Sequence, residues 1–398
     1  MINIRTLVTA YRNLDTAGHP MVLATVVETL GSTYRKAGAR MLITGDGQFH
    51  GIIGGGCFEG DLLEHARAVF ETGHPRVLFY DMYDMRARED ELWGLGLGCN
   101  GAVRLLLQRL DTTPGRNPVV DLEHCLRTRS QGVLATVCAS AESDYPVGWH
   151  AFFEDNAAVL DPPVDNRPDW LAQGARNAQQ TGAPLFIEHK VGSGAVTVFY
   201  DWVGPPPHLL VIGAGPDALP VVKLARVLDW EVTVVDHREA YADPQRFTDA
   251  DRVSTTTPEA LPAHVKMETV DAVVLMTHNI GYDERFLKVL APSEVGYIGM
   301  LGPAARRERV LNGLGASGDR ASADSLRNRV FGPVGLDIGA ELPEEIGVSI
   351  IAELLAYFRG GGRRAGRAHN NPAQGNPTHG DPAHGVPVAD SSLPAEEV

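Results

Sequence analysis

An internal repeat in the first 200 residues constrains the fold of this chain more than any other feature of its sequence. The pentapeptide VLATV at 22–26 returns unchanged at 133–137. Further along, the segment at 61–75 is echoed at 169–184, where DLL and TGHP in the first copy become DWL and TGAP in the second. Each copy combines apolar strand patterns with one helical pattern. We therefore predict an N-terminal α+β domain with an internal duplication, covering residues 1–203 as pseudo-repeats of about 1–110 and 116–203.

The sequence from 208 to 358 alternates apolar strands with helical segments, which is typical of parallel βαβ units. Its first strand, HLLVI, runs into a turn that contains Gly213 and Gly215, and Asp236 ends the next strand 21 residues after Gly215. In dinucleotide-binding proteins such glycines allow a tight turn and close approach of the pyrophosphate, and the carboxylate binds ribose hydroxyls. We predict an α/β protein whose C-terminal domain, 208–358, has a Rossmann-type parallel sheet with these three residues at a nucleotide site.

Composition limits the partners and the compartment. A formal net charge of −15 over 398 residues argues against broad contact with nucleic acid or anionic lipid. No apolar run is long enough for a membrane span, and the first residues lack the pattern of a secretory signal. Four cysteines without a CxxC pair favour neither a disulfide framework nor a zinc site, so we expect a cytoplasmic protein. Repeated Asn/Asp-Pro and Gly in 359–398 predict a disordered tail.

Two glycine-flanked cysteines distinguish the first copy of the repeat from the second. Cys57 follows three glycines just before the helical segment, where the second copy reads DPPV; Cys99 lies in GLGCNG, where the second copy reads GSG. A residue needed for the shared scaffold should appear in both copies, so these cysteines point to function. A helix N-terminus lowers the pKa of a thiol, and a thiolate binds soft metals or handles sulfur. The alternative is a small buried cysteine in a tight turn.

Other candidate binding residues lie in loops. A glycine-bounded basic loop at 31–40 could bind phosphate through Arg35, Lys36 and Arg40, although a solvated hairpin tip has the same pattern. A glycine-rich turn with Asp337 is expected to bring the backbone close to a ligand or to the other domain. Two strands of the C-terminal domain end in polar side chains at the carboxyl edge of the predicted sheet, where such sheets bind ligands. For the histidine among them, an ordinary loop position is equally open. The candidates outside the glycine turn and the cysteines are Arg35, Gly55, Gly56, Glu59, His278, Arg306 and Asp337.

Together these motifs resemble the XdhC/CoxI family of maturation factors for xanthine and carbon monoxide dehydrogenases. The resemblance covers nearly the whole chain before the tail. It rests on ATVVETLGSTYRKAGARMLI, GGGCFEGDL, GLGCNG, VIGAG with VDHR, MTHNIGYD, YIGMLGPAARR and GPVGLDIGAELPEEIGVSIIAEL. Pro216-Asp217 after the glycine turn and Pro303 in a later loop depart from the family pattern and weaken the expectation of a classical NAD site.

The resemblance implies a protein that binds molybdenum cofactor, assists its sulfuration and inserts it into a molybdenum hydroxylase such as xanthine dehydrogenase. By matching motif, Cys57 and Cys99 would lie at the cofactor and could contact its molybdenum. Such a protein is a cofactor-insertion chaperone more than an enzyme with turnover, and a cysteine desulfurase and a second copy of the chain are further expected partners. The residues implied to bind phosphate or nucleotide parts are Arg35, Gly215, Asp236 and Arg306.

Other functions stay open at this point. An NAD(P)-dependent oxidoreductase would hold NAD(P) in the Rossmann domain with His278 or a cysteine near the nicotinamide, but no clear acid/base pair lies beside the glycine turn. A thiol or sulfur-relay enzyme would use Cys57 and Cys99 as a pair that forms a disulfide or carries a persulfide. A nucleotide sensor without catalysis is the weakest alternative.

Overall fold

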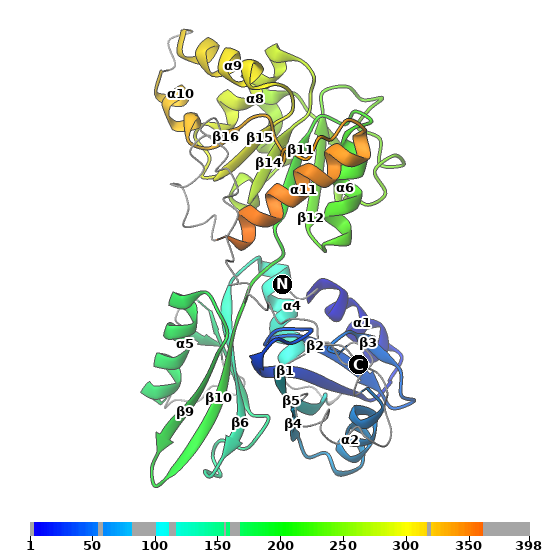
Figure 1. The fold of residues 1–398 in the computed structure, drawn as a ribbon, viewed down its shortest axis with the longest axis vertical. Helices are drawn as coiled ribbons and strands as arrows, with labels where there is room; N and C mark the ends of the chain where they lie inside the picture. The colour runs from blue at the N-terminus through cyan, green and yellow to red at the C-terminus, as the bar shows by residue number, and fades with distance from the viewer. Residues whose placement is uncertain are drawn as a thin grey trace, which may run out of the picture.

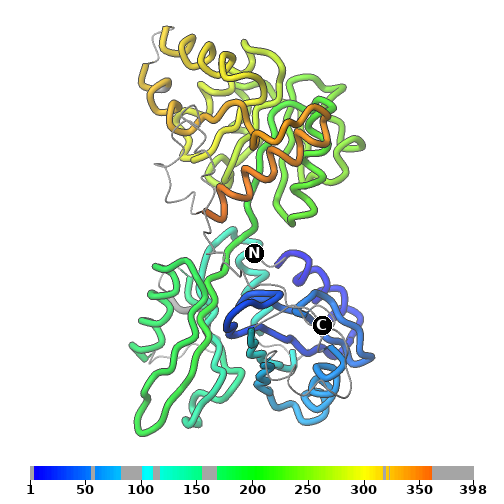
Figure 2. Tube along the Cα trace, in the orientation of Figure 1, coloured from blue at the N-terminus to red at the C-terminus, as the bar shows by residue number. Residues whose placement is uncertain are grey.

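A computed structural model describes residues 4–54, 59–81, 101–110, 117–154, 157–159, 168–316 and 320–360. The described chain forms two lobes, one ending at Val203 and one beginning at His208, joined by a short connection (Figures 1 and 2). No helix in these ranges is both long and apolar enough to cross a membrane. Of the predicted tail at 359–398, Arg359 is instead the last residue of a helix, and residues 361–398 lie outside the described residues. The predicted site residues Gly55, Gly56, Cys57 and Cys99 lie outside them too.

Within the described residues, the N-terminal lobe has two antiparallel sheets with the same strand order, β3-β2-β1-β5-β4 and β8-β7-β6-β10-β9. This shared order confirms the predicted duplication. The strands of the first sheet are β1 (Met21–Gly31), β2 (Arg40–Thr44), β3 (Phe49–Gly51), β4 (Arg76–Asp81) and β5 (Gly101–Leu110). Those of the second are β6 (Gly132–Ser140), β7 (His150–Glu154), β8 (Ala157–Val159), β9 (Leu185–Val191) and β10 (Gly194–Val203).

The two sheets also share an irregularity at the same place. The pairing of β1 with β5 skips Val27, and the pairing of β6 with β10 skips Cys138. Each of these residues stands at the same distance from the start of its VLATV motif. A β-bulge of this kind adds an unpaired residue and bends the strand. The two bulged residues pack together with Leu106 and Phe199, which are themselves equivalent in the two copies, so the sheets meet around matching positions.

Each copy carries two helices among its described residues, where we predicted one. The helices α2 (Glu59–Thr72) and α5 (Asp169–Thr181) each pack on a sheet and close its core. The other two, α1 (Ile4–Thr16) and α4 (Pro118–Thr128), precede the first strand of each copy and pack against each other. The motifs shared by the copies begin after α1 and α4, so the repeat did not predict these helices.

A buried ion pair joins the two copies. The guanidinium of Arg40, the first residue of β2, lies 2.6 Å from a carboxylate oxygen of Asp201 in β10. These side chains are only 2% and 6% exposed. The strand registers place His150 and Gln108 at the equivalent positions of the opposite copies. The backbone of the duplication is therefore symmetric at this place, but the charges are not.

The C-terminal lobe has a six-stranded parallel sheet in the order β13-β12-β11-β14-β15-β16, which confirms the predicted Rossmann topology. Its strands are β11 (His208–Ile212), β12 (Glu231–Asp236), β13 (Arg252–Thr255), β14 (Ala272–Leu275), β15 (Tyr297–Met300) and β16 (Val330–Phe331). Its helices are α6 (Ala218–Val227), α7 (Leu261–His264), α8 (Ile280–Leu290), α9 (Ala304–Ala316), α10 (Arg320–Arg327) and α11 (Pro343–Arg359). Short 3-10 turns lie at Pro258–Ala260 and Met267–Thr269.

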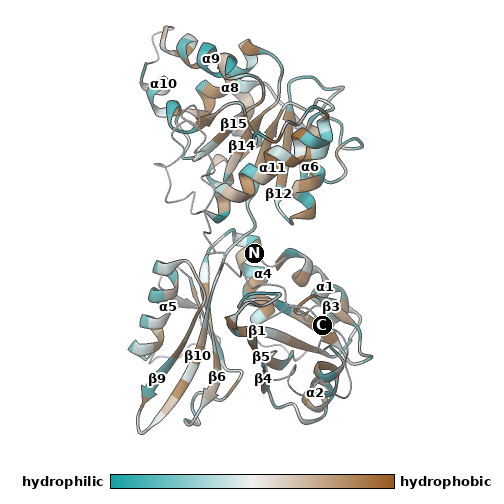
Figure 3. Cartoon of the chain, viewed as in Figure 1, coloured by the Kyte–Doolittle hydropathy of each residue, from teal (hydrophilic) through white to brown (hydrophobic). Residues whose placement is uncertain are grey.

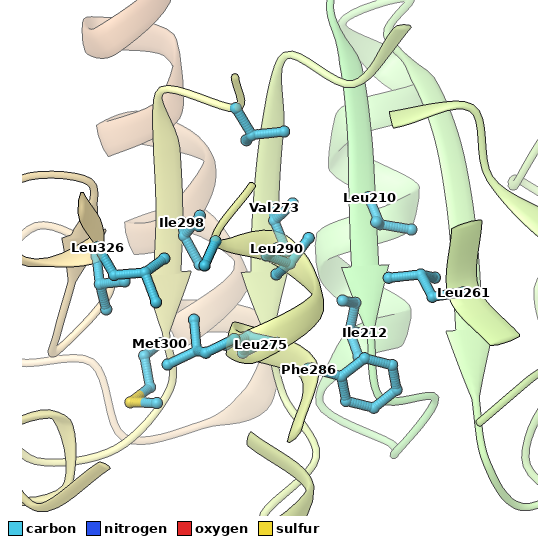
Figure 4. Close-up of a cluster of buried hydrophobic side chains, with 14 of the residues drawn as sticks. Leu210, Ile212, Leu261, Val273, Leu275, Phe286, Leu290, Ile298, Met300 and Leu326 are labelled. Carbon is cyan, nitrogen blue, oxygen red and sulfur yellow. The ribbon is translucent and has the colours of Figure 1, made fainter. Parts of the chain in front are cut away.

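The central strands β11 and β14 are mostly apolar and are buried along their whole length, because helices cover both faces of the sheet (Figure 3). On one face, Leu210 and Ile212 of β11 pack with Phe286 of α8 (Figure 4). On the other face, α6 and α11 cover the sheet, with Val211 and Ile350 in one cluster. Helix α11 begins at Pro343, because proline has no N–H to leave unpaired at the first helical position and its fixed φ suits the helix.

The N-terminal lobe contacts the C-terminal lobe at the amino ends of the parallel strands. Arg129, at the end of α4, pairs with Glu231 at the start of β12 and lies 3.3 Å from Asp271, just before β14. Arg5 of α1 lies 2.6 Å from Asp251, just before β13. The carboxyl edge of the sheet, where Rossmann folds bind ligands, therefore faces away from the N-terminal lobe (Figure 1).

Candidate functional site

The glycine turn after β11 forms the centre of the carboxyl edge. Gly213 has φ +111°, and a Cβ placed on it would lie 2.4 Å from the carbonyl oxygen of Met276, so only glycine lets the chain pass the end of β14. A Cβ on Gly215 would meet nothing within 4 Å. The first glycine thus serves packing within the sheet, and the second borders open space above the N-terminus of α6.

Asp236 ends β12 as predicted, but protein donors surround its carboxylate. One oxygen accepts the backbone N–H of Ala214 at 2.7 Å, and Arg238 donates to both oxygens through its side chain at 2.9 and 2.8 Å. Burial opposes ionisation of Asp236, but the hydrogen bonds from Arg238 and Ala214 outweigh it and lower its pKa. A ribose would have to displace Arg238 to bind this carboxylate in the usual way.

A second carboxylate occupies the start of α6. Asp217 is the residue before the helix, and its Oδ2 lies 3.1 Å from Nε2 of His278, which follows β14 with φ +55°. His278 is 55% exposed at this point. In a dinucleotide site the pyrophosphate binds at this helix end, attracted by the helix dipole and its free N–H groups. A carboxylate there repels phosphate, so the local charge opposes classical pyrophosphate binding.

Arg306 also has a partner inside the protein. Its side chain donates to Asp283 Oδ2 at 3.0 Å from Nε and 2.6 Å from Nη2, and Asp283 also accepts the hydroxyl of Thr277. Asp283 is 1% exposed. The network joins the ends of β14, α8 and α9 and neutralises the arginine, so Arg306 organises the carboxyl edge and offers a ligand less charge than the sequence suggested.

Asp337, the last of the predicted binding residues of this domain, lies apart from those just described. It is exposed in the loop between β16 and α11. The N–H of Leu336 in this loop donates to the carbonyl of Ser349 in α11 at 3.3 Å, so the loop is held against that helix. Gly347 of α11 packs against Pro220 in the first turn of α6. The structure thus brings the loop to the side of the glycine turn, with Asp337 on its surface.

In the N-terminal lobe, Arg35 lies in the loop between β1 and β2, and Glu59 is the first residue of α2. Gly101, where the described chain resumes after the Cys99 segment, pairs with Gly31 at the base of that loop. A Cβ on Gly101 would lie 2.4 Å from the carbonyl oxygen of Leu30. Gly101 therefore lies against the base of the Arg35 loop.

Sequence reasoning missed an aromatic and cationic group beside Asp236. The rings of His237 and Tyr282 stack with centroids 3.6 Å apart, and the Arg238 guanidinium lies 3.7 Å from the centroid of Tyr241. The sequence VDHR shows the histidine and the arginine of this group, but their aromatic partners come from α8 and from the loop after β12. Across the residues with described placement, no cluster of three metal-ligating side chains occurs.

The structure separates the predicted site residues into two groups. Gly213, Gly215, Asp236, His278 and Arg306 surround the carboxyl edge of the Rossmann sheet. Arg35 and Glu59 belong to the first copy of the duplicated lobe, on the far side of that sheet. The fold and these two groups define a two-domain protein that couples a Rossmann domain to a duplicated α+β domain.

Comparison with known proteins narrows this class. Residues 209–354 match the family described as the XdhC Rossmann domain, and residues 14–81 match the XdhC and CoxI family. A Bacillus subtilis (strain 168) protein, named as a probable subunit of xanthine dehydrogenase, is 33% identical over 334 residues, covering 84% of this chain and 92% of that protein. The chain belongs to the XdhC and CoxI family.

Two further relatives agree with this assignment. The molybdenum cofactor insertion chaperone PaoD of Escherichia coli (strain K12) is 22% identical over 342 residues, covering 85% of this chain and 83% of that protein. A crystal structure described as a xanthine dehydrogenase from Bacillus halodurans superimposes with a TM-score of 0.68 at 28% identity. It covers 90% of this chain and 96% of that one, so both lobes have counterparts in it.

Proposed function

We propose that this protein is a maturation factor that binds molybdenum cofactor and delivers it to a molybdenum hydroxylase such as xanthine dehydrogenase. The names of its relatives, a molybdenum cofactor insertion chaperone and a probable component of xanthine dehydrogenase, support this role. The observation that carries the proposal is the asymmetry of the duplication. The two copies have the same strand order, but only the sequence of the first contains the glycine-flanked Cys57 and Cys99.

The residues around these cysteines suit the cargo. Gly101, two residues after Cys99 in the sequence, abuts the loop that carries Arg35. Molybdenum held by a dithiolene is soft and accepts a thiolate ligand, while a guanidinium binds the phosphate of the pterin tail. The proposal includes a role in sulfuration, in which the bound cofactor would be presented to a sulfur donor such as a cysteine desulfurase.

The carboxyl edge of the Rossmann sheet is poorly suited to NAD(P)-dependent oxidation. Asp217 places a negative charge at the pyrophosphate position, and the side chain of Arg238 pairs with the Asp236 carboxylate that would bind the ribose. We propose that this domain takes part in binding or presenting the cofactor without hydride transfer.

Metal and pterin analysis of protein purified anaerobically from a cofactor-producing host tests the proposal. We expect near-stoichiometric molybdenum and pterin in the wild type and a loss of most of both in Cys57→Ala and in Cys99→Ala. Cys138→Val is the matched control, because Cys138 is buried and valine stands at the equivalent position in the first copy. Empty wild-type protein with retained NAD(P), or full loading of both cysteine variants, would refute the proposal.

A further inference from the structure

The two lobes share no apolar core. Each buried apolar cluster of the described chain takes all its side chains from one lobe: the clusters of the N-terminal lobe reach Val203, and those of the C-terminal lobe begin at Leu209. Domains of one chain move relative to each other unless a large apolar interface holds them. The contact between these lobes therefore depends on polar groups.

Two arginines of the N-terminal lobe supply much of that contact. Arg129 pairs with Glu231 and with Asp271, and Arg5 pairs with Asp251. We call these five residues the ionic latch. Their side chains are between 18% and 29% exposed, so water and salt reach them. Ion pairs that solvent reaches weaken as the salt concentration rises.

Two carboxylates of the latch also have partners inside their own lobe. Asp271 accepts the N–H of His208 at 2.9 Å. Asp251 accepts the N–H of Val232 at 2.9 Å and lies 3.3 Å from Arg226. These contacts lie at the amino ends of β11 and β12 and do not involve the N-terminal lobe. Separation of the lobes therefore breaks the latch without leaving these two carboxylates unpaired.

The connection between the lobes is short and is anchored at both ends. Val203 pairs with Gly132 at the end of β10, and the carbonyl of Pro207 accepts the N–H of Glu231 at 2.9 Å. Only residues 204–206, a glycine and two prolines, lie between these anchors. Proline has a fixed φ and no N–H, so rotation of one lobe against the other is confined to a few backbone torsions there.

We propose that the two lobes rotate about residues 204–206 and that the ionic latch sets the fraction of chains that are closed. In the closed form the N-terminal lobe lies against the amino edge of the parallel sheet (Figure 1). Salt and other anions compete with the carboxylates for Arg5 and Arg129, and the chain then opens while each lobe keeps its own core. The hinge stands without the proposed function, and only its use in releasing cargo rests on that function.

Single-molecule energy transfer between dyes on the two lobes tests the hinge. Asn13 in α1 and Lys223 in α6 are exposed and lie outside the latch, and a ketone-bearing amino acid at each position takes a dye without reaction at any cysteine. At picomolar concentration each signal comes from one chain. Between about 10 mM and about 1 M NaCl the screening length falls from about 30 Å to about 3 Å, so we expect the open fraction to rise at least about tenfold. Arg5→Ala with Arg129→Ala should be open to a similar extent at low salt.

Arg104→Ala with Arg285→Ala is the matched control, because it also removes two arginines from ion pairs, but each pair lies within one lobe. Equal energy transfer in the wild type at both salt concentrations would overturn the hinge, and that titration needs no substitution, so a variant that fails to fold does not decide the result. Opening of the control as large as that of the latch variant would overturn the role of the latch. Protein without molybdenum serves for every measurement, so a hinge that opens there holds even where the proposed function is refuted.

Discussion

The buried pair of Arg40 and Asp201 makes a sharp test of how the duplicated lobe is held together. Changing Asp201→Asn removes the charge that compensates a guanidinium with an exposed fraction of 2%. Removing one partner of a buried ion pair costs about 3–5 kcal/mol, and the isosteric amide keeps some hydrogen bonding, so we expect about 3 kcal/mol. In a lobe of this size that lowers the melting temperature by about 6–12 °C.

Calorimetry of the full chain is the assay, because the two lobes can melt in separate transitions. The transition of the N-terminal lobe should shift, and that of the Rossmann lobe should not. The double variant Arg40→Met with Asp201→Val replaces the pair with apolar side chains and should lie within about 1 kcal/mol of the wild type. A single variant as stable as the wild type, or additive losses in the double variant, would refute the reasoning.

Three other predictions concern single positions. Burial raises the pKa of Cys125 and of Cys138 to about 12, so that only about 10⁻⁴ of each thiol is ionised at pH 8. Iodoacetamide should therefore leave both thiols unmodified in the native protein. Rapid labelling before unfolding, detected by mass spectrometry, would contradict this. Gly213→Ala should lower the free energy of unfolding of the Rossmann lobe by at least about 3 kcal/mol, because φ at Gly213 is +111°. Gly215→Ala should lower it by about 1 kcal/mol or less, because a Cβ there meets open space; urea unfolding measures both. Asp217→Asn should raise the affinity for pyrophosphate about fivefold in titration calorimetry, and an unchanged affinity would show that this carboxylate does not repel phosphate.

The sequence was sufficient to predict topology where a pattern recurs or has a known geometric reason. VLATV at 22–26 and 133–137 predicted two copies of one unit, and the structure has two sheets of one order. The alternation of apolar strands with helical segments in 208–358 predicted the parallel sheet, and the glycine turn with Asp236 predicted which strand ends lie together at its carboxyl edge. The repeat did not predict helices α1 and α4, because their amphipathic patterns are not among the motifs that the two copies share.

Side-chain partners and lobe orientation were beyond the sequence. Nothing local to Asp236 shows that Arg238, two residues on, closes over it, since that depends on the path of the chain after β12. Asp283 lies 23 residues from Arg306 and meets it only in the folded lobe. The orientation of the lobes depends on ion pairs such as Arg129 with Glu231, 102 residues apart. The placement of Cys57 and Cys99 relative to these groups stays a prediction.

The matched bulges at Val27 and Cys138 carry a consequence for the origin of the chain. The apolar side chains that join the two sheets would be exposed on a single copy, so one copy alone would bury them only by pairing with an identical chain. The ancestor implied by this symmetry is a homodimer of one five-stranded unit. Joining two such units in one chain holds the pairing covalently, so that the copies differ at matching positions such as Arg40 and His150 without losing it.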